Sequence, residues 1–157
     1  MLKLSPIVLS ILTLFLISCK NNYQSDNSGF GIVIHGGAGT ILKENMSEEK
    51  EIAIQNVMNQ ALDTGYEILS SGGSALDAVE VAVKILDDSP LFNAGKGSVY
   101  WANVIQEMDA AIMDGASGMA GSITGVSRLK NPVSVARAVM EKSNHVMLSG
   151  WGAEEFA

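Results

Sequence analysis

The sequence has little positive charge, little histidine and almost no cysteine. Ten Lys and Arg residues stand against 17 Asp and Glu among 157 residues, so the formal net charge is −7. Without a basic stripe that could neutralise phosphates, the chain is not expected to bind nucleic acid. One cysteine cannot form an internal disulfide, and with only two histidines beside it no zinc site is expected.

What is present suits a folded chain. Apolar residues make up 47% of the sequence and charged residues 17%, and there are 16 glycines. That apolar fraction is ordinary for a globular domain and too high for a disordered chain. The length alone would suggest one domain.

Residues 1–18 predict an export signal. Lys3 precedes an apolar run, Ile7–Ile17, which is too short to span a bilayer comfortably. Cys19 follows this run, and the segment resembles a bacterial lipoprotein signal, which is cut before a cysteine whose thiol is then lipidated. We therefore expect an exported protein, a membrane-anchored lipoprotein or a periplasmic protein, with residues 19–29 as a tether. The alternatives are an ordinary signal peptide and a tethering helix.

Hydrophobic periodicity and turn residues predict a mixture of strands and helices after the tether. Strands are expected at 30–35, 107–113, 118–126 and 145–148. Helices are expected from Ser47 to Gly72, from Ser74 to Leu86, from Asn131 through Met140, and from about Gly152. Residues 89–97 are expected to form a loop. This mixture indicates the α/β or α+β class.

The glycine-rich segment His35–Gly39 follows the first predicted strand, but it completes no nucleotide-binding motif. A dinucleotide fingerprint would need glycine where Leu42 stands. Gly95-Lys96 is followed by Gly97 rather than Ser or Thr, so it is no phosphate loop, and no G-x-S-x-G elbow occurs. Taken alone, the segment fits a tight turn as well as a site, and His35 by itself indicates a core histidine.

Acidic residues offer candidate functional groups with plain alternatives. Asp87 and Asp88, at a predicted helix end, could bind a cation or form a solvated face. Asp109 and Asp114 could be catalytic carboxylates or could cap turns.

Six ordered segments together resemble one family. They are Ile32–Gly39, Ser74–Val79, Pro90–Gly97, Met108–Gly115, Gly125–Pro132, and Ala136–Glu141 with His145–Met147. Their order and spacing over residues 30–157 are similar to the plant-type L-asparaginase/isoaspartyl peptidase family of N-terminal nucleophile hydrolases.

The resemblance implies an αββα sandwich, incomplete in this chain, whose precursor cleaves itself into α and β subunits assembled as (αβ)2. The new N-terminal Thr of the β subunit is the nucleophile, and its free α-amine can act as the base. The implied substrates are asparagine and isoaspartyl dipeptides.

This sequence departs from the family at the nucleophile. None of Thr13, Thr40, Thr64 and Thr124 stands in a Gly-Thr-[Val/Ile]-Gly-Ala-type stretch. We expect the nucleophile to lie beyond Ala157, so that residues 30–157 form most of an α subunit, inactive until a missing β subunit completes it. The alternatives are a non-catalytic lipoprotein remnant and a glycosylasparaginase-like hydrolase.

Two site residues and one loop carry over from the family. Gly37 matches a glycine whose backbone lines the substrate pocket, and Asn93 lies near the expected nucleophile, although it could be a turn residue. Main-chain carbonyls of six residues match a loop that holds a sodium ion: Leu86, Asp87, Ser89, Phe92, Ala94 and Lys96. An ordered loop without a cation is the alternative, and no catalytic cofactor is implied.

Overall fold

The computed structural model describes residues 29–38, 42–102 and 104–157. The predicted export signal, Cys19 and all of the tether except Gly29 lie outside these residues, as does Thr40. None of the helices in the described ranges is both long and apolar enough to cross a membrane. The predicted mixed class is confirmed, with these elements in chain order: η1 (Lys43–Asn45), α2 (Glu48–Ser70), α3 (Ala75–Asp87), η2 (Gly95–Gly97), β1 (Met108–Met113), β2 (Ala120–Val126), α4 (Pro132–Lys142), β3 (Met147–Ser149) and α5 (Gly150–Phe156).

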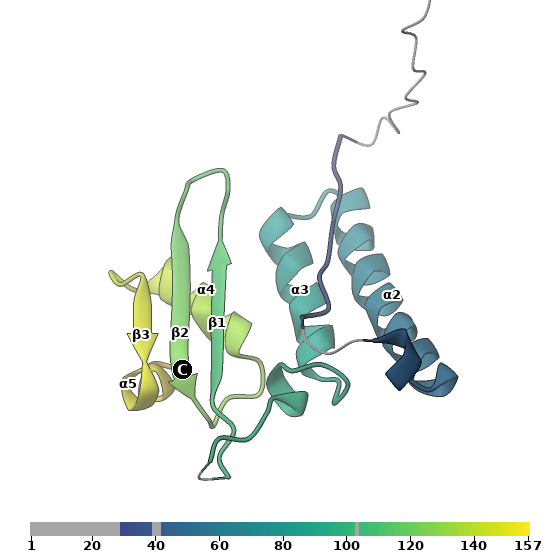
Figure 1. Cartoon of the computed structure of the whole chain (residues 1–157). Helices are drawn as coiled ribbons and strands as arrows, with labels where there is room; N and C mark the ends of the chain where they lie inside the picture. Colours follow the sequence, from purple (N-terminus) through teal and green to yellow (C-terminus); the bar gives the residue numbers. More distant parts are fainter. Residues whose placement is uncertain (1–28, 39–41, 103) are drawn as a thin grey trace, which may run out of the picture.

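Helices α2 and α3 form an antiparallel hairpin (Figure 1). Both begin at a predicted serine cap: Ser47 Oγ accepts the Lys50 N–H at 3.3 Å, and Ser74 Oγ accepts the Asp77 N–H at 3.1 Å. The helices pack closely because Gly65 has no side chain. A methyl group there would meet Ile32 Cδ1 and lie 3.4 Å from the Ala78 carbonyl oxygen.

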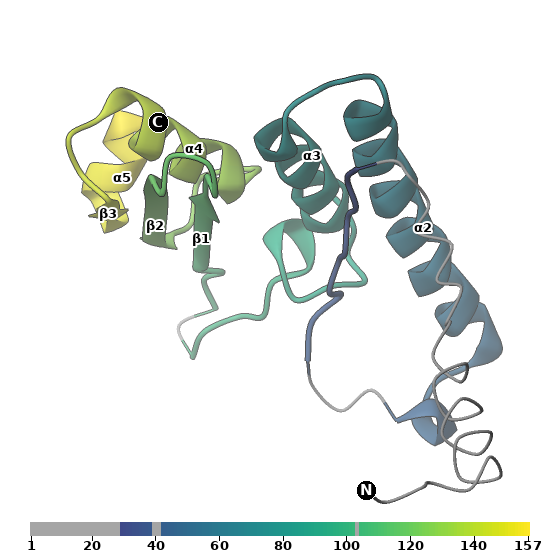
Figure 2. The ribbon, with the colours of Figure 1, turned by 90° about the horizontal axis from the view of Figure 1, so that it is seen from above.

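The second unit is a three-stranded sheet in the order β1-β2-β3. β1 and β2 are antiparallel, with Met113 opposite Ala120, whereas β2 and β3 are parallel and joined through α4. Helices α4 and α5 lie on the same face of this sheet (Figure 2).

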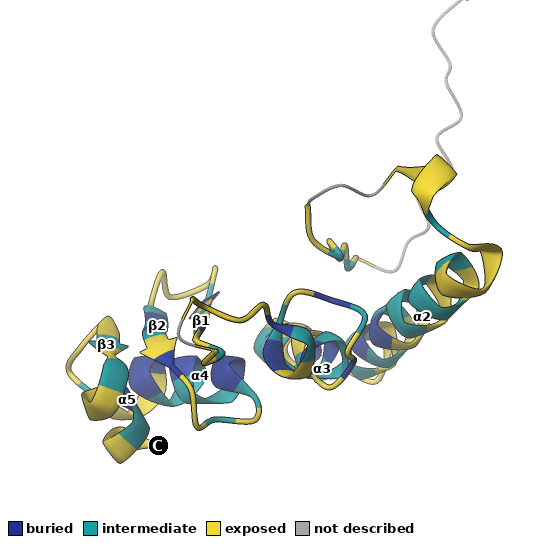
Figure 3. Ribbon diagram, turned by 60° about the horizontal axis from the view of Figure 1, so that its bottom comes forward, coloured by how far each residue is buried: buried dark blue, intermediate teal, exposed yellow. Residues whose placement is uncertain are grey.

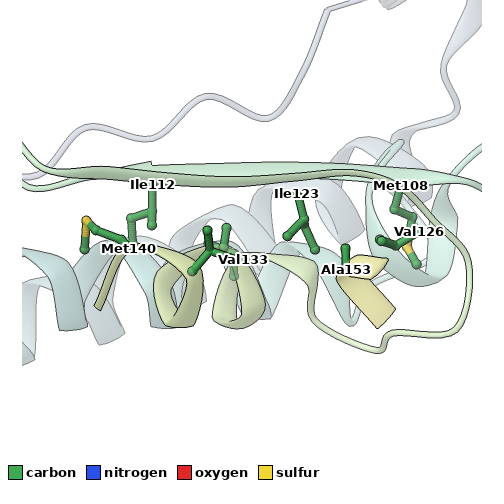
Figure 4. Close-up of a cluster of buried hydrophobic side chains, with 9 residues drawn as sticks. Met108, Ile112, Ile123, Val126, Val133, Met140 and Ala153 are labelled. Carbon is green, nitrogen blue, oxygen red and sulfur yellow. The ribbon is translucent and has the colours of Figure 1, made fainter. Parts of the chain in front are cut away.

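Buried side chains of β1 and β2 form a core with these two helices. Ile112 and Ile123 point from the sheet toward Val133 and Met140 of α4, as Figure 4 shows. Gly121 permits this packing, since a methyl group there would collide with the α4 backbone and lie 2.8 Å from Met140 Cβ. The close approach predicted for this small-residue strand is confirmed.

The predicted strand at 30–35 is wrong. The segment runs beside α3 without pairing to any described strand (Figure 1), and the Val33 side chain is 95% exposed. A strand needs a neighbour that accepts its backbone hydrogen bonds, and no described strand lies beside this one. The last strand was also misplaced, since β3 covers 147–149, and α5 begins at Gly150 rather than near Gly152.

Candidate functional site

The glycine turn after residue 35 and the loop after α3 meet at an open cavity of about 540 Å³. Gly37 and Asn93 both line it, although they belong to motifs far apart in the sequence. Four of the six residues predicted to hold sodium line it as well: Leu86, Asp87, Phe92 and Ala94. The structure therefore brings six of the eight family-derived site residues to one place.

The turn presents open backbone to this cavity. Gly37 has a φ of +104°, a left-handed conformation that favours glycine. Apart from its two chain neighbours, no described residue has an atom within 4 Å of the position that a Cβ would take. Its N–H donates to His35 Nδ1 at 3.1 Å. His35 is exposed, so its interpretation as a core histidine is wrong; instead it braces the turn.

The loop after α3 folds back on the helix end. The Ser89 N–H donates to the Leu86 carbonyl oxygen at 3.1 Å, and the Gly97 N–H donates to that of Ala94 at 3.0 Å. Gly95, with a φ of +49°, packs directly on Asp87: a methyl group at Gly95 would lie 2.6 Å from Asp87 Cβ. A methyl group at Gly97 would strike the Phe92 carbonyl oxygen. The main chain of the loop can therefore pack this closely only because glycine stands at both Gly95 and Gly97.

Asn93 is partly a turn residue, as the plainer interpretation held. Its Oδ1 accepts the Val99 N–H at 2.9 Å, which ties the two sides of the loop together. Its Nδ2 has no partner within the described part of the chain, and the residue is exposed beside the cavity. The carboxamide therefore offers a free donor while its oxygen holds the loop.

The two adjacent aspartates differ sharply. Asp88 is exposed, and its carboxylate contacts Lys130 Nζ at 3.3 Å and accepts from Asn131 Nδ2 at 3.3 Å. Asp87 is 5% exposed, and its carboxyl group has no hydrogen-bond or ion-pair partner among the described residues. Burial, and secondarily the charge of Asp88, raise the pKa of Asp87 to about 6. The interpretation as a solvated face is therefore correct for Asp88 and wrong for Asp87.

A second cavity, of about 300 Å³, also borders Asp87 and Asn93. Ser98 lines it, is 8% exposed, and has a buried Oγ without a partner in the described chain. Sequence reasoning missed Ser98; the only signal was a hydroxyl residue directly after Gly95-Lys96-Gly97. Buried hydroxyl groups in proteins normally have a hydrogen-bond partner, so the Ser98 Oγ indicates a position where a bound polar group could contact the protein.

Two predicted sodium-loop residues lie apart from the first cavity. Ser89 is buried, and its Oγ accepts the Leu91 N–H at 3.3 Å. Lys96 is exposed and lines a different pocket together with Lys130. Their side chains do not contribute to the candidate site.

The other candidate carboxylates have structural partners. Asp109 accepts hydrogen bonds from Thr124 Oγ1 at 2.5 Å and from the Gly125 N–H at 2.9 Å, where the β1–β2 register shifts. Asp114 accepts from the N–H groups of Ala116 and Ser117 and therefore caps a turn. These hydrogen bonds lower the pKa of both carboxyl groups. The turn-capping alternative is correct for Asp114. Asp109 instead stabilises the irregular pairing of β1 with β2.

Comparison with known proteins gives one consistent family. The family model described as asparaginase matches residues 28–157. Over 126 residues, 80% of this chain, the sequence is 48% identical to an isoaspartyl peptidase of Escherichia coli and 54% identical to a plant-type L-asparaginase of Pyrococcus furiosus. It is 47% identical to an isoaspartyl peptidase/L-asparaginase of Mus musculus.

These matches cover only part of each relative. The matched residues span 39%, 40% and 37% of the Escherichia coli, Pyrococcus furiosus and Mus musculus proteins, respectively. The loop from Leu86 to Ser98 and the turn at Gly37 both fall within the residues that the family model matches.

Proposed function

This chain belongs to the asparaginase family, and from that premise we propose that the protein hydrolyses β-aspartyl amide or isopeptide bonds. Its substrates are L-asparagine and isoaspartyl dipeptides, which release ammonia or an amino acid. One observation carries the proposal. Gly37 and Asn93, assigned to the substrate pocket by separate motifs, line the same cavity.

Each of the two residues has a role that its surroundings allow. The open backbone at Gly37 lets a substrate approach the main chain without meeting a side chain. Asn93 is held by its Oδ1, so its free Nδ2 is a preorganised donor. A donor of this kind stabilises the negative charge that develops on a carbonyl oxygen during acyl transfer.

The nucleophile itself is assigned to no residue of this chain. We propose that a Thr exposed by self-cleavage supplies it, from a β subunit that corresponds to part of the relatives' unmatched length. Backbone cleavage creates the α-amine that can deprotonate the Thr hydroxyl, so activation and cleavage are the same event. The proposed assembly is (αβ)2, in which this chain contributes the loop side of the pocket.

The loop after α3 is proposed to hold a sodium ion. The residues fit a hard cation because the main chain is curled tightly around Gly95 and Gly97, which brings the carbonyl oxygens of Asp87 and Phe92 against the opposite side of the loop. Sodium would hold the loop, and with it Asn93, in one conformation. The carbonyl oxygen of Ala94 accepts one N–H, from Gly97, and retains a second lone pair.

Export and lipid attachment at Cys19 are proposed on independent grounds, from residues 1–19 alone. A lipoprotein signal would place the hydrolase in the cell envelope.

The direct test uses the complete gene product. We expect a purified precursor to divide into two polypeptides on a denaturing gel, to release ammonia from L-asparagine, and to release leucine from β-aspartyl-leucine. A product that neither divides nor hydrolyses either substrate would overturn the proposal in favour of a non-catalytic lipoprotein.

The variant Asn93→Asp tests the assigned donor. It keeps an oxygen for the Val99 N–H but loses the Nδ2 donor, so kcat should fall about 100-fold. Asn59→Asp, at an exposed position of α2, is the matched control and should retain activity. Equal activity of the two variants would show that Asn93 only closes its loop.

A further inference from the structure

Asp87 is the most unusual ionisable residue in the described structure. It ends α3, is 5% exposed, and has no hydrogen-bond or ion-pair partner among the described residues. An unpaired buried carboxylate is costly, so such groups in proteins are normally paired or bind a cation. No ion pair joins Asp87 to Lys84 or Lys96, the cations nearest in sequence, within the described residues.

Among the described residues, no lysine or arginine lines either of the two cavities that Asp87 borders. The backbone of Gly95 packs on Asp87, since a methyl group at Gly95 would strike the Asp87 carbonyl oxygen and lie 2.6 Å from Asp87 Cβ. The unpartnered Ser98 Oγ lines the same 300 Å³ cavity as Asp87. Two unpaired buried polar groups beside a carbonyl-rich loop point to a ligand that is a cation.

We propose that the Asp87 carboxylate is the counter-charge of the cation in this loop, so that sodium binding depends on this side chain as well as on main-chain carbonyls. The inference rests on the sodium loop of the proposed function and goes beyond it. A ring of carbonyl oxygens is neutral, whereas one carboxylate balances one monovalent cation. Ligand charge is a main determinant of how tightly an oxygen site binds a cation.

The neighbouring aspartate provides a matched control. Asp88 is the same residue type one position later, but its carboxylate is exposed and paired with Lys130. Asp87→Asn and Asp88→Asn therefore remove the same charge from the same loop, and only the first removes it from the buried site. Asp87→Glu keeps the charge and should keep the sodium response.

The experiment measures thermal unfolding of the full chain in sodium chloride and in choline chloride at equal ionic strength. We expect the wild type, Asp88→Asn and Asp87→Glu to unfold at higher temperature in sodium. Asp87→Asn should lose this response, and titration should show sodium affinity reduced about tenfold or more. In choline, Asp87→Asn should be at least as stable as the wild type, because it has no unpaired buried charge.

A second measurement, independent of unfolding, is the line width of the ²³Na resonance. The wild type should broaden it and Asp87→Asn should not. If Asp87→Asn retains the wild-type sodium response, the carbonyl oxygens alone suffice and the inference is overturned, while the sodium loop stands.

Two further outcomes would also overturn it. A wild type that responds to neither salt would remove the sodium loop as well, although the hydrolase assay could still succeed. If Asp87→Asn and the smaller Asp87→Ser both fail to fold in choline, Asp87 has a structural role that needs no cation.

Discussion

The two parts of the described chain are stabilised by different means. In the part from β1 to α5, nine buried apolar residues form one continuous core between the sheet and its helices. In the part before β1, the buried apolar side chains of the described residues are three alanines and Phe92. Figure 3 shows the contrast, with dark buried positions concentrated in α4 and the sheet and lighter ones along α2. The candidate site lies in the weakly packed part.

This difference explains how the site loop is held. Where apolar burial is small, order comes from main-chain contacts at Gly95 and Gly97 and from the Asn93 side chain. The exposed apolar side chain of Val83, on α3, lines the first cavity. We therefore expect a bound cation to stabilise this part more than the part from β1 to α5.

A pair of identical substitutions tests the contrast most strongly. Ile123 is 1% exposed in the core, whereas Ile54 on α2 is only half-buried. Ile123→Ala should lower the free energy of unfolding by about 4 kcal/mol, because it opens a cavity in close-packed surroundings, and Ile54→Ala by about 1 kcal/mol. Urea unfolding followed by circular dichroism measures both. Equal losses would mean that the helical hairpin is as well packed as the sheet.

Local signals made much of the fold predictable from the sequence. The serines at 47 and 74 predicted the starts of α2 and α3, and Gly72 predicted the end of α2, because caps and terminators act over three or four residues. The strand prediction for residues 30–35 was wrong for the opposite reason. Its apolar residues indicate a strand, but strand formation depends on a neighbour elsewhere in the chain, which composition cannot reveal.

The site was predictable only through the family resemblance. Nothing in the spacing of Gly37 and Asn93 shows that they meet, since α2 and α3 separate them. Asp87 and Asp88 are identical in type and adjacent, and their different environments follow from how the loop folds back over one of them. That fold-back depends on close contacts at two glycines, which are specific to the three-dimensional structure.

Arg137 joins the two parts and gives the next largest expected effect. Its Nη1 donates to Asp77 at 2.6 Å and to Glu80 at 2.8 Å on α3, and Ser134 Oγ donates to Glu80 at 2.6 Å. Arg137→Met should lower the free energy of unfolding by about 2 kcal/mol, because it leaves the mostly buried Glu80 without its cation. Lys43→Met, which breaks an exposed pair with Glu51, is the control and should cost much less.

The same bridge predicts a pH dependence. Burial would raise the pKa of Glu80, but hydrogen bonds from Ser134 and Arg137 outweigh it, so the pKa is lowered. The pKa of Asp77 is lowered by hydrogen bonds from Ser74 and Arg137. Since both values are lower in the folded state, their contribution is present above the ordinary carboxyl range and lost as pH falls through the folded values. Thermal unfolding from neutral to acid pH should show a steeper loss for the wild type than for Arg137→Met; parallel curves would contradict the assignment.

The smallest predicted effect compares the helix starts of the two parts. Ser74 caps α3 through its side chain, whereas Asn131 stands at the N-cap of α4 and makes no capping bond. The Asn131 Nδ2 donates to Asp88. Ser74→Ala should therefore cost about 1 kcal/mol, and Asn131→Ala only a few tenths, since its hydrogen bond is long and exposed. The two urea midpoints measure the difference. A larger loss for Asn131→Ala would show that its contact with Asp88, rather than the core beneath α4, holds that helix against the site loop.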